Sequence, residues 1–158
     1  GRGADGKSLV LVAVEDKDNH LGRIRLRRVA DASEISLIPF VQENVEPGNT
    51  VRTDDWNGYK GLTSKGYNHI VVRQSDNVGE NLLPLAHRVI ALLKRWLQGT
   101  HQGAVRDSHL DYYLDEFTFR FNRRTSKSRG KLFYRLLQQA VNVEPVRGQD
   151  IRGGRICS

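Results

Sequence analysis

The chain has 158 residues, of which 38% are hydrophobic, and this is the size of a single domain that can bury most of its surface. The formal net charge is +7 and it is unevenly spread. Residues 1–87 hold 11 Lys and Arg against 12 Asp and Glu, whereas residues 88–158 hold 14 against 6. This surplus favours a polyanionic partner. Nucleic acid is favoured over a membrane, because no stretch approaches the ~20 apolar residues of a spanning helix.

The cysteine and methionine content bears on the cellular setting. A single cysteine, Cys157, excludes an internal disulfide, and nothing at the N-terminus resembles a signal peptide. A reducing, cytoplasmic setting is therefore expected. The chain contains no Met, so we expect that its first residue is not a native start and that it is a fragment.

The first half of the chain is predicted to form strands and one helix. An apolar run at residues 8–14 is typical of a strand that is buried on both faces. Arginine alternates with apolar residues at 23–29, and a turn-rich stretch joins the two runs, so a hairpin is expected. Residues 33–44 predict a short helix that bends or starts late around Pro39. Two further strands are predicted at residues 49–53 and 69–73.

The second half is predicted to be helical. A helix begins at Pro84 with an apolar stripe, and Gly99 is placed to end it. Ser108 is expected to cap a second helix, and a third, weaker helix is expected at residues 132–141. The two stripes consist of Leu85, Val89, Leu92, Leu93 and Trp96, and of Leu110, Tyr113, Leu114, Phe117 and Phe121. This order of strands and helices predicts an α/β fold on a mixed sheet, with a domain at residues 1–144 and a disordered tail at residues 145–158.

An acidic pair, Asp54–Asp55, follows the strand predicted at residues 49–53. The pair is compatible with an Asx turn and with metal-binding carboxylates, and local sequence does not decide between them. On the helix from Pro84, His87 and Lys94 lie seven residues apart, which returns to within about 20° of the same helix face. They form a polar edge separate from the apolar stripe. His87 is equally compatible with an exposed surface histidine.

Three long strings carry a resemblance to a known family: TDDWNGYKGL, LPLAHRVIALLKRWLQGTHQG and HLDYYLDEFTFRFNRR. They resemble the ISXO-like group of bacterial insertion-sequence transposases, over residues 7 to 140. The resemblance implies an RNase H-like catalytic domain of the DDE type, with an acidic triad followed by a lysine. Asp54 matches the second acid, His87 the third position and Lys94 the lysine, which is the Asp-Asp-His-Lys variant. The family more often has Gly at position 55, so which aspartate faces the metal stays open.

The resemblance also implies an activity and partners. A transposase of this type cuts a phosphodiester with water and then attacks target DNA with the freed 3′-hydroxyl. Two Mg²⁺ or Mn²⁺ ions would be held in the complete protein, with Asp54 and His87 among their ligands, while Lys94 positions a phosphate. The implied partners are double-stranded DNA, at the element ends and the target, and further copies of the chain. Localisation would be cytoplasmic, and nucleoid-associated when bound to DNA.

One expected ligand has no counterpart in this sequence. By resemblance, the first aspartate lies on a central strand just before the Gly-rich start, and Asp5, Glu15 and Asp16 do not match its motif. We therefore expect a sheet that lacks its first strand, and a chain that is inactive alone. The second hypothesis is a non-catalytic, DNA-binding remnant of a truncated transposase that keeps the basic surface and has lost the triad.

Further DNA-binding candidates are basic residues on the predicted helices. The candidates are Arg95, Arg120, Arg123 and Arg124. Around residues 117–124, aromatic residues are interleaved with basic ones, and there Arg123 and Arg124 are better DNA-binding candidates than the phenylalanines. Phe117 and Phe121 themselves have the spacing of core residues. Neither His spacing nor a Cys pair supports a zinc site at His101 and His109, and Cys157 does not have the setting of a nucleophile.

Overall fold

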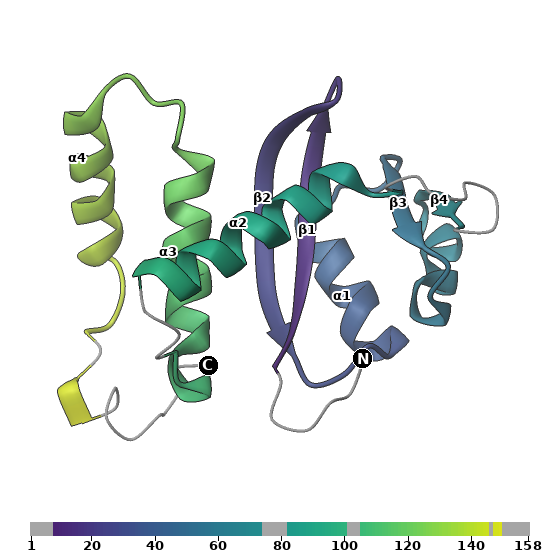
Figure 1. The fold of residues 1–158 in the computed structure, drawn as a ribbon, viewed down its shortest axis with the longest axis horizontal. Coiled ribbons are helices and arrows are strands. Elements are labelled where there is room, and N and C mark those ends of the chain that lie inside the picture. Colours follow the sequence, from purple (N-terminus) through teal and green to yellow (C-terminus); the bar gives the residue numbers. More distant parts are fainter. Residues whose placement is uncertain (1–7, 74–81, 101–104, 146, 150–158) are drawn as a thin grey trace.

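The computed structural model describes residues 8–73, 82–100, 105–145 and 147–149 (Figure 1). These residues form small sheets and helices, so the predicted α/β class is confirmed. The elements in chain order are β1 Leu9–Lys17, β2 His20–Val29, α1 Glu34–Asn44, β3 Thr50–Asp54, the 3-10 helix η1 Asn57–Lys65, β4 Asn68–Val72, α2 Pro84–Thr100, a 3-10 turn Asp107–His109, α3 Leu110–Asn122 and α4 Arg129–Ala140. All four predicted strands and all four predicted helices are present, and η1 is an addition.

The predicted hairpin is confirmed, since β1 and β2 pair antiparallel. Asp18 and Asn19 connect them with φ angles of 51° and 65°. Two consecutive positive φ angles are the signature of a type I′ turn, whose twist matches that of the flanking strands. A bulge lies between Val14 and Asp16. There the Glu15 carboxylate accepts the backbone N–H of Arg23 at 2.8 Å.

The hairpin separates two hydrophobic cores (Figure 1). On one face, Val12 and Ile24 pack against side chains of α2 and α3, and we call this cluster the hairpin core. On the other face, Leu11 packs against Leu37 and Phe40 of α1. The apolar run of β1 is thus covered on both faces, as its sequence predicts.

Helix α3 closes the outer edge of β2. The backbone N–H of Ile24 donates to Asn122 Oδ1 at 2.7 Å, and Asn122 Nδ2 donates back to the Ile24 carbonyl at 3.0 Å. Arg28 of β2 forms ion pairs of 2.9 Å with both Asp107 and Asp111, at the start of α3. The side chain of one helix residue therefore takes the place of a neighbouring strand.

The predicted single mixed sheet is not seen among the described residues. β3 and β4 pair parallel to each other, and β1 and β2 form a separate two-stranded sheet. Helix α1 links the two sheets. Its Leu37 packs with Leu11 of β1. Its Ile38 and Val41 pack with Leu62 of η1 and with Tyr67, which follows η1. Side-chain packing, rather than a shared hydrogen-bond ladder, connects these two parts.

Several predicted helix ends are shifted. α1 begins at Glu34, five residues before Pro39, so the late start was wrong. α2 continues past Gly99. Ser108 does not cap α3: the chain enters it through the 3-10 turn, and His109 stands at the cap position without a side-chain hydrogen bond. Of the predicted tail, residues 146 and 150–158 lie outside the described residues.

Candidate functional site

Asp54 lies at the carboxyl edge of the parallel pair. It is the last residue of β3 and stands opposite Val72, the last residue of β4. Asp54 is partly buried, whereas the neighbouring Asp55 is exposed and forms a 3.0 Å ion pair with Arg73. The structure therefore gives the two adjacent aspartates different surroundings.

A hydrogen-bond chain that the sequence analysis did not identify fixes the backbone at Asp54. The buried Thr53 hydroxyl donates to the Asp54 carbonyl at 2.8 Å, and His69 Nε2 lies 2.7 Å from the same Thr53 oxygen. Because the hydroxyl proton is already used, His69 must donate through Nε2. Burial lowers the pKa of His69, in keeping with a neutral imidazole in this position. No spacing signal could have paired residues 53 and 69, since strand register alone brings them together.

Helix α2 presents the polar edge that the sequence predicts. His87 lies in its first turn, where its backbone N–H donates to the Leu83 carbonyl at 3.0 Å. His87 and Lys94 are both exposed, whereas Val89 and Leu93 are buried against the hairpin core. The helix thus separates a core face from an edge that can meet a ligand.

A complete metal centre is not assembled within the described residues. No group of three or more His, Cys, Asp or Glu side chains there is placed to hold a metal ion. Glu15 and Asp16 instead stabilise the hairpin. The Arg23 N–H holds the pKa of Glu15 below its ordinary value, and Asp16 accepts the Asn19 N–H at 2.8 Å. Asp5 lies outside the described residues.

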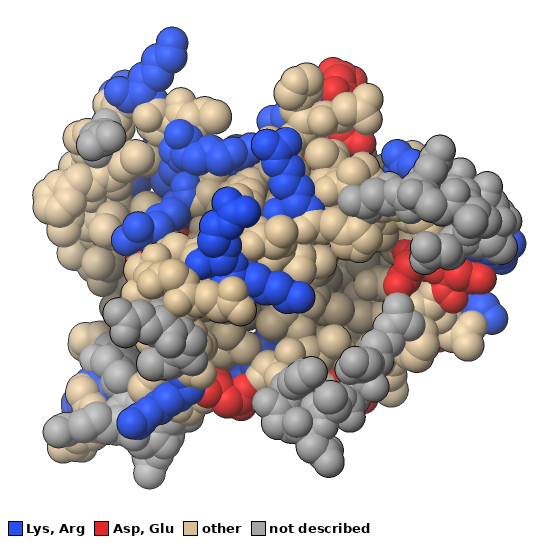
Figure 2. Space-filling view, in the orientation of Figure 1, with Lys and Arg blue, Asp and Glu red and all other residues tan. Residues whose placement is uncertain are grey.

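Basic side chains gather on one face of the molecule. Figure 2 shows Lys and Arg side chains concentrated over the region of α2 and α3, whereas acidic side chains appear at the tip of the β1–β2 hairpin and on the side of β3 and β4. Arg88, Lys94 and Arg95 are exposed along α2. Arg120 on α3 is also exposed, although a 2.8 Å ion pair with Glu116 neutralises part of its charge. The exposed arginine and lysine side chains of α2 are therefore the larger source of positive potential.

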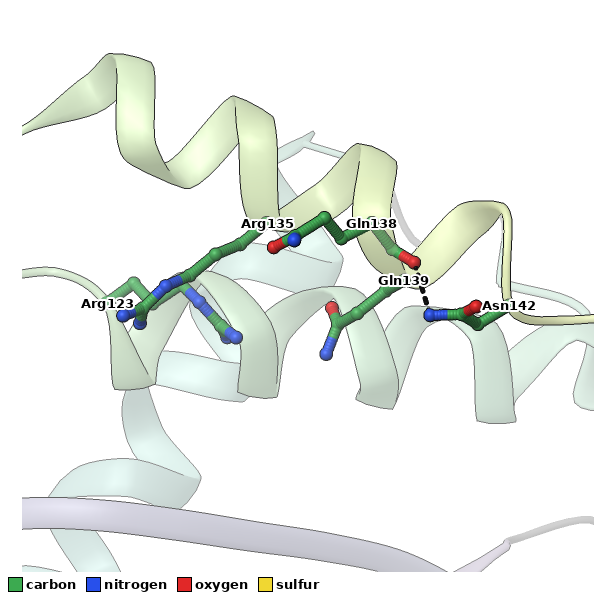
Figure 3. Close-up of a pocket in the computed structure, with 5 residues that line it drawn as sticks. All are labelled: Arg123, Arg135, Gln138, Gln139 and Asn142. Atoms are coloured by element: carbon green, nitrogen blue, oxygen red, sulfur yellow. Dashed lines mark hydrogen bonds between the residues drawn. The ribbon is translucent and has the colours of Figure 1, made fainter.

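The adjacent Arg123 and Arg124 differ in their contacts. Arg124 donates to the carbonyl oxygens of Leu21, of Gly22 at 3.2 Å and of Phe121 at 2.9 Å, so it links the end of α3 to β2. Arg123 lies 3.8 Å above the Phe119 ring and lines an open pocket between α3 and α4 (Figure 3). Arg123 therefore offers its guanidinium to a ligand more readily than Arg124 does.

The predicted core role of the aromatic residues on α3 is confirmed. Phe117 and Phe121 are each 8% exposed and pack against Ile24, Val89 and other residues of the hairpin core. His101 and Cys157 lie outside the described residues. Among the residues that are described, no helix combines the length and the apolar character needed to cross a bilayer.

Two comparisons with known proteins found transposase-related matches. A family described as the ISXO2-like transposase domain matches residues 1–122. A Haemophilus influenzae protein named "Uncharacterized transposase-like protein" is 26% identical over 120 residues, which cover 72% of this chain and 92% of that protein. No solved structure matches the chain.

Proposed function

Because the chain belongs to the family of ISXO2-like transposase domains, we propose that it is the catalytic domain of an insertion-sequence transposase, which cuts DNA at the ends of a mobile element and joins them to a target. The placement of Asp54 carries this proposal. It lies at the carboxyl edge of a parallel strand pair, with its carbonyl held by Thr53. On α2, His87 and Lys94 share one exposed edge.

The proposed roles follow from the chemistry of the side chains. Asp54 and His87 act as catalytic metal ligands, contributing one carboxylate and one imidazole, a pair that suits Mn²⁺ better than Mg²⁺. Divalent ions, when bound, stabilise the attacking and leaving oxygens of a phosphodiester. Lys94 and Arg95 contact DNA phosphates. Asp55 stays outside the ligand set, because its carboxylate is engaged by Arg73.

A third ligand is needed, and we assign it to a further strand between β1 and β3. Within the described residues, β1 pairs only with β2 and β3 only with β4. Asn122 bonds the N–H and C=O of Ile24 on the outer edge of β2, where a further strand would have to pair. Among the described residues, the strand edges that remain are those of β1, β3 and β4, and a strand between β1 and β3 is the one that would join the two sheets. An acid on that strand would complete an RNase H-like centre, and without it we expect residues 1–158 to leave DNA uncut.

The test compares the 158-residue chain with the same chain extended by the coding sequence upstream of Gly1. Both are incubated with Mn²⁺ and a duplex that carries the ends of the encoding element, and cleavage and joining are measured on gels. We expect activity only from the extended protein. Asp54→Asn should abolish it and the matched control Asp55→Asn should retain it. Cleavage by the 158 residues alone, or by the Asp54→Asn protein, would contradict this assignment.

One observation favours a second candidate function, a non-catalytic DNA-binding remnant. The described residues lack any group of three side chains that could hold a metal, while the basic side chains of α2 are exposed. Fluorescence anisotropy with labelled duplex DNA, alongside the cleavage assay, separates the two functions. A remnant would bind the element ends, yet neither the chain nor its extended form would cut them.

A further inference from the structure

A polar pocket of about 430 Å³ lies open between α3 and α4 (Figure 3), and we call it the α3–α4 pocket. It is lined by two guanidinium groups and three carboxamides, which belong to Arg123, Arg135, Gln138, Gln139 and Asn142. Arg123 follows the last residue of α3, whereas the other four stand on α4 or two residues beyond its end. All five lie beyond residues 1–122 that match the family, so the family match does not account for this pocket.

Helix α4 turns its polar side toward the pocket. Arg135, Gln138 and Asn142 recur at intervals of three and four residues, so they share one side of the helix. The apolar residues of α4 are exposed instead, by 63% at Phe133, 48% at Leu136 and 47% at Leu137. The hairpin core includes side chains of α3 but, within the described part of the chain, none of α4. Across the pocket, α3 and α4 therefore face each other with polar groups rather than with apolar ones.

Positive charge is concentrated at the α3–α4 pocket. Residues 117–143 contain seven Lys and Arg and no Asp or Glu. Neither pocket arginine is among the described arginines that form ion pairs, which are Arg27, Arg28, Arg73 and Arg120. Arg123 stacks on the Phe119 ring and donates one N–H to the Phe119 carbonyl at 3.5 Å, which leaves its other N–H donors for a ligand. Two guanidinium groups that line one pocket repel each other, and an anion between them relieves this repulsion.

We propose that the α3–α4 pocket binds a backbone phosphate of DNA and so extends the DNA-binding surface from α2 onto α4. This proposal rests on the proposed transposase function, because membership of the family makes DNA the expected polyanion. Two guanidinium groups can bind one phosphate through parallel N–H···O bonds. The carboxamides can donate to its remaining oxygens. One of them is already oriented beside the pocket, because Asn142 Nδ2 donates to the Gln138 carbonyl at 2.9 Å.

The surroundings of the pocket favour a strand of DNA over a small phosphate compound. The pocket is open, so a continuous backbone can pass through it. The Lys and Arg side chains over α2 and α3 continue toward the side of the molecule where α4 lies (Figure 1 and Figure 2), where they can bind neighbouring phosphates of the same strand. The Phe119 ring stacks on Arg123, which favours a contact with phosphate over stacking on a base.

Fluorescence anisotropy of the 158-residue chain with labelled duplex DNA tests the pocket. Arg135→Gln should weaken binding about tenfold, as expected when hydrogen bonds to a charged group are lost. Arg135→Lys keeps the charge but not the forked donors, so it should recover only part of the affinity. The matched control Lys65→Gln removes one charge from η1 and should change binding by less than about twofold. Equal losses in Arg135→Gln and Lys65→Gln, or full affinity in Arg135→Lys, would overturn the proposal.

A second measurement needs no substitution in the pocket. In NMR spectra of the ¹⁵N-labelled chain, the side-chain amide signals of Gln138, Gln139 and Asn142 should shift when DNA is added. The amide of Asn68 is the control, since it donates to the Gly48 carbonyl at 3.1 Å on the far side of the hairpin from α4 (Figure 1). Pocket signals that stay unchanged at saturating DNA would contradict the proposed phosphate contact.

Inorganic phosphate, compared with chloride at equal ionic strength, identifies the source of the ligand. Shifts of the pocket amides with phosphate but not with DNA would assign the pocket to a small phosphate compound and reject DNA. The pocket and the catalytic function can also fail separately. Cleavage by the extended protein together with an unaffected affinity of Arg135→Gln would reject the pocket alone. Binding that depends on the pocket, without cleavage by the extended protein, would reject the catalytic function alone.

Discussion

At the scale of single residues, two adjacent residues of the same type make different contacts. Asp54 and Asp55 have the same side chain, but Asp54 is partly buried at the end of β3, whereas Asp55 is exposed and forms an ion pair with Arg73. Arg123 and Arg124 both stack on a phenylalanine ring. Arg124 also donates to two carbonyl oxygens of β2, whereas Arg123 donates to the Phe119 carbonyl of α3 at 3.5 Å. Successive residues of a strand or helix point in different directions, so adjacent positions meet different surroundings.

The arginine pair gives a prediction that separates stability from DNA binding. Arg124→Ala leaves the Leu21 and Gly22 carbonyls without their donor and should lower the free energy of unfolding by about 1–3 kcal/mol. Arg123→Ala should change stability little and should weaken binding to duplex DNA. Urea denaturation and fluorescence anisotropy measure the two effects. Equal losses of stability in both variants would refute this division.

His69 should make stability depend on pH. Burial lowers the pKa of His69 in the folded protein, so the unfolded chain binds more protons just below the ordinary value near 6.5. The free energy of unfolding should therefore rise with pH from the folded pKa up to the ordinary value, and fall on acidification. Thermal denaturation at several pH values measures this dependence. His69→Gln keeps a donor for Thr53 and should flatten the dependence relative to the wild type; an identical pH profile would exclude His69 as its source.

The preference for Mn²⁺ or Mg²⁺ should depend on which residue stands at position 87 of the proposed site. A neutral imidazole at position 87 has one negative charge less than a carboxylate and adds a nitrogen donor, which favours Mn²⁺ over Mg²⁺. In the extended, active protein, His87→Glu should lower the ratio of the Mn²⁺-supported to the Mg²⁺-supported cleavage rate. His109→Glu, at an imidazole outside the proposed ligand set, is the control and should keep the wild-type ratio. An unchanged ratio in the His87 variant would argue against its role as a ligand.

At the scale of elements, side chains rather than strands complete the hairpin. Asn122→Ala removes two hydrogen bonds from the Ile24 backbone, leaving a partly buried N–H and C=O without partners. The expected decrease in the free energy of unfolding is about 1–3 kcal/mol for each group that stays unsatisfied. Asn142→Ala removes one exposed hydrogen bond at the end of α4 and is the matched control. Urea denaturation should show a large shift only for the first variant, and comparable shifts would mean that the Asn122 bonds contribute little.

At the scale of the whole molecule, sequence periodicity predicts the elements better than their assembly. The alternation in β2 and the stripe on α2 predict which residues are buried, because that choice depends on local spacing. The separation of β1 and β2 from β3 and β4 could not be predicted, since strand pairing is decided by residues distant in the chain. The His69–Thr53 hydrogen bond was missed for the same reason. The outward face of α4 was also missed, because the stripe shows that a helix is amphipathic without showing what covers it.

The basic surface gives the prediction at this scale. If Lys94, Arg95 and Arg123 bind phosphates, replacing all three with Ala should flatten the plot of log binding constant against log salt by about 0.9 for each phosphate that is no longer neutralised. Replacing Lys17, Lys60 and Lys65, which are exposed on the hairpin tip and η1, lowers the net charge by the same amount and is the control. Anisotropy titrations with duplex DNA at several salt concentrations measure both slopes. Since long-range attraction depends on total charge while counterion release depends on direct binding to phosphates, only the first variant should change the slope. Equal slopes in the two variants would mean that DNA does not bind along α2 and the end of α3.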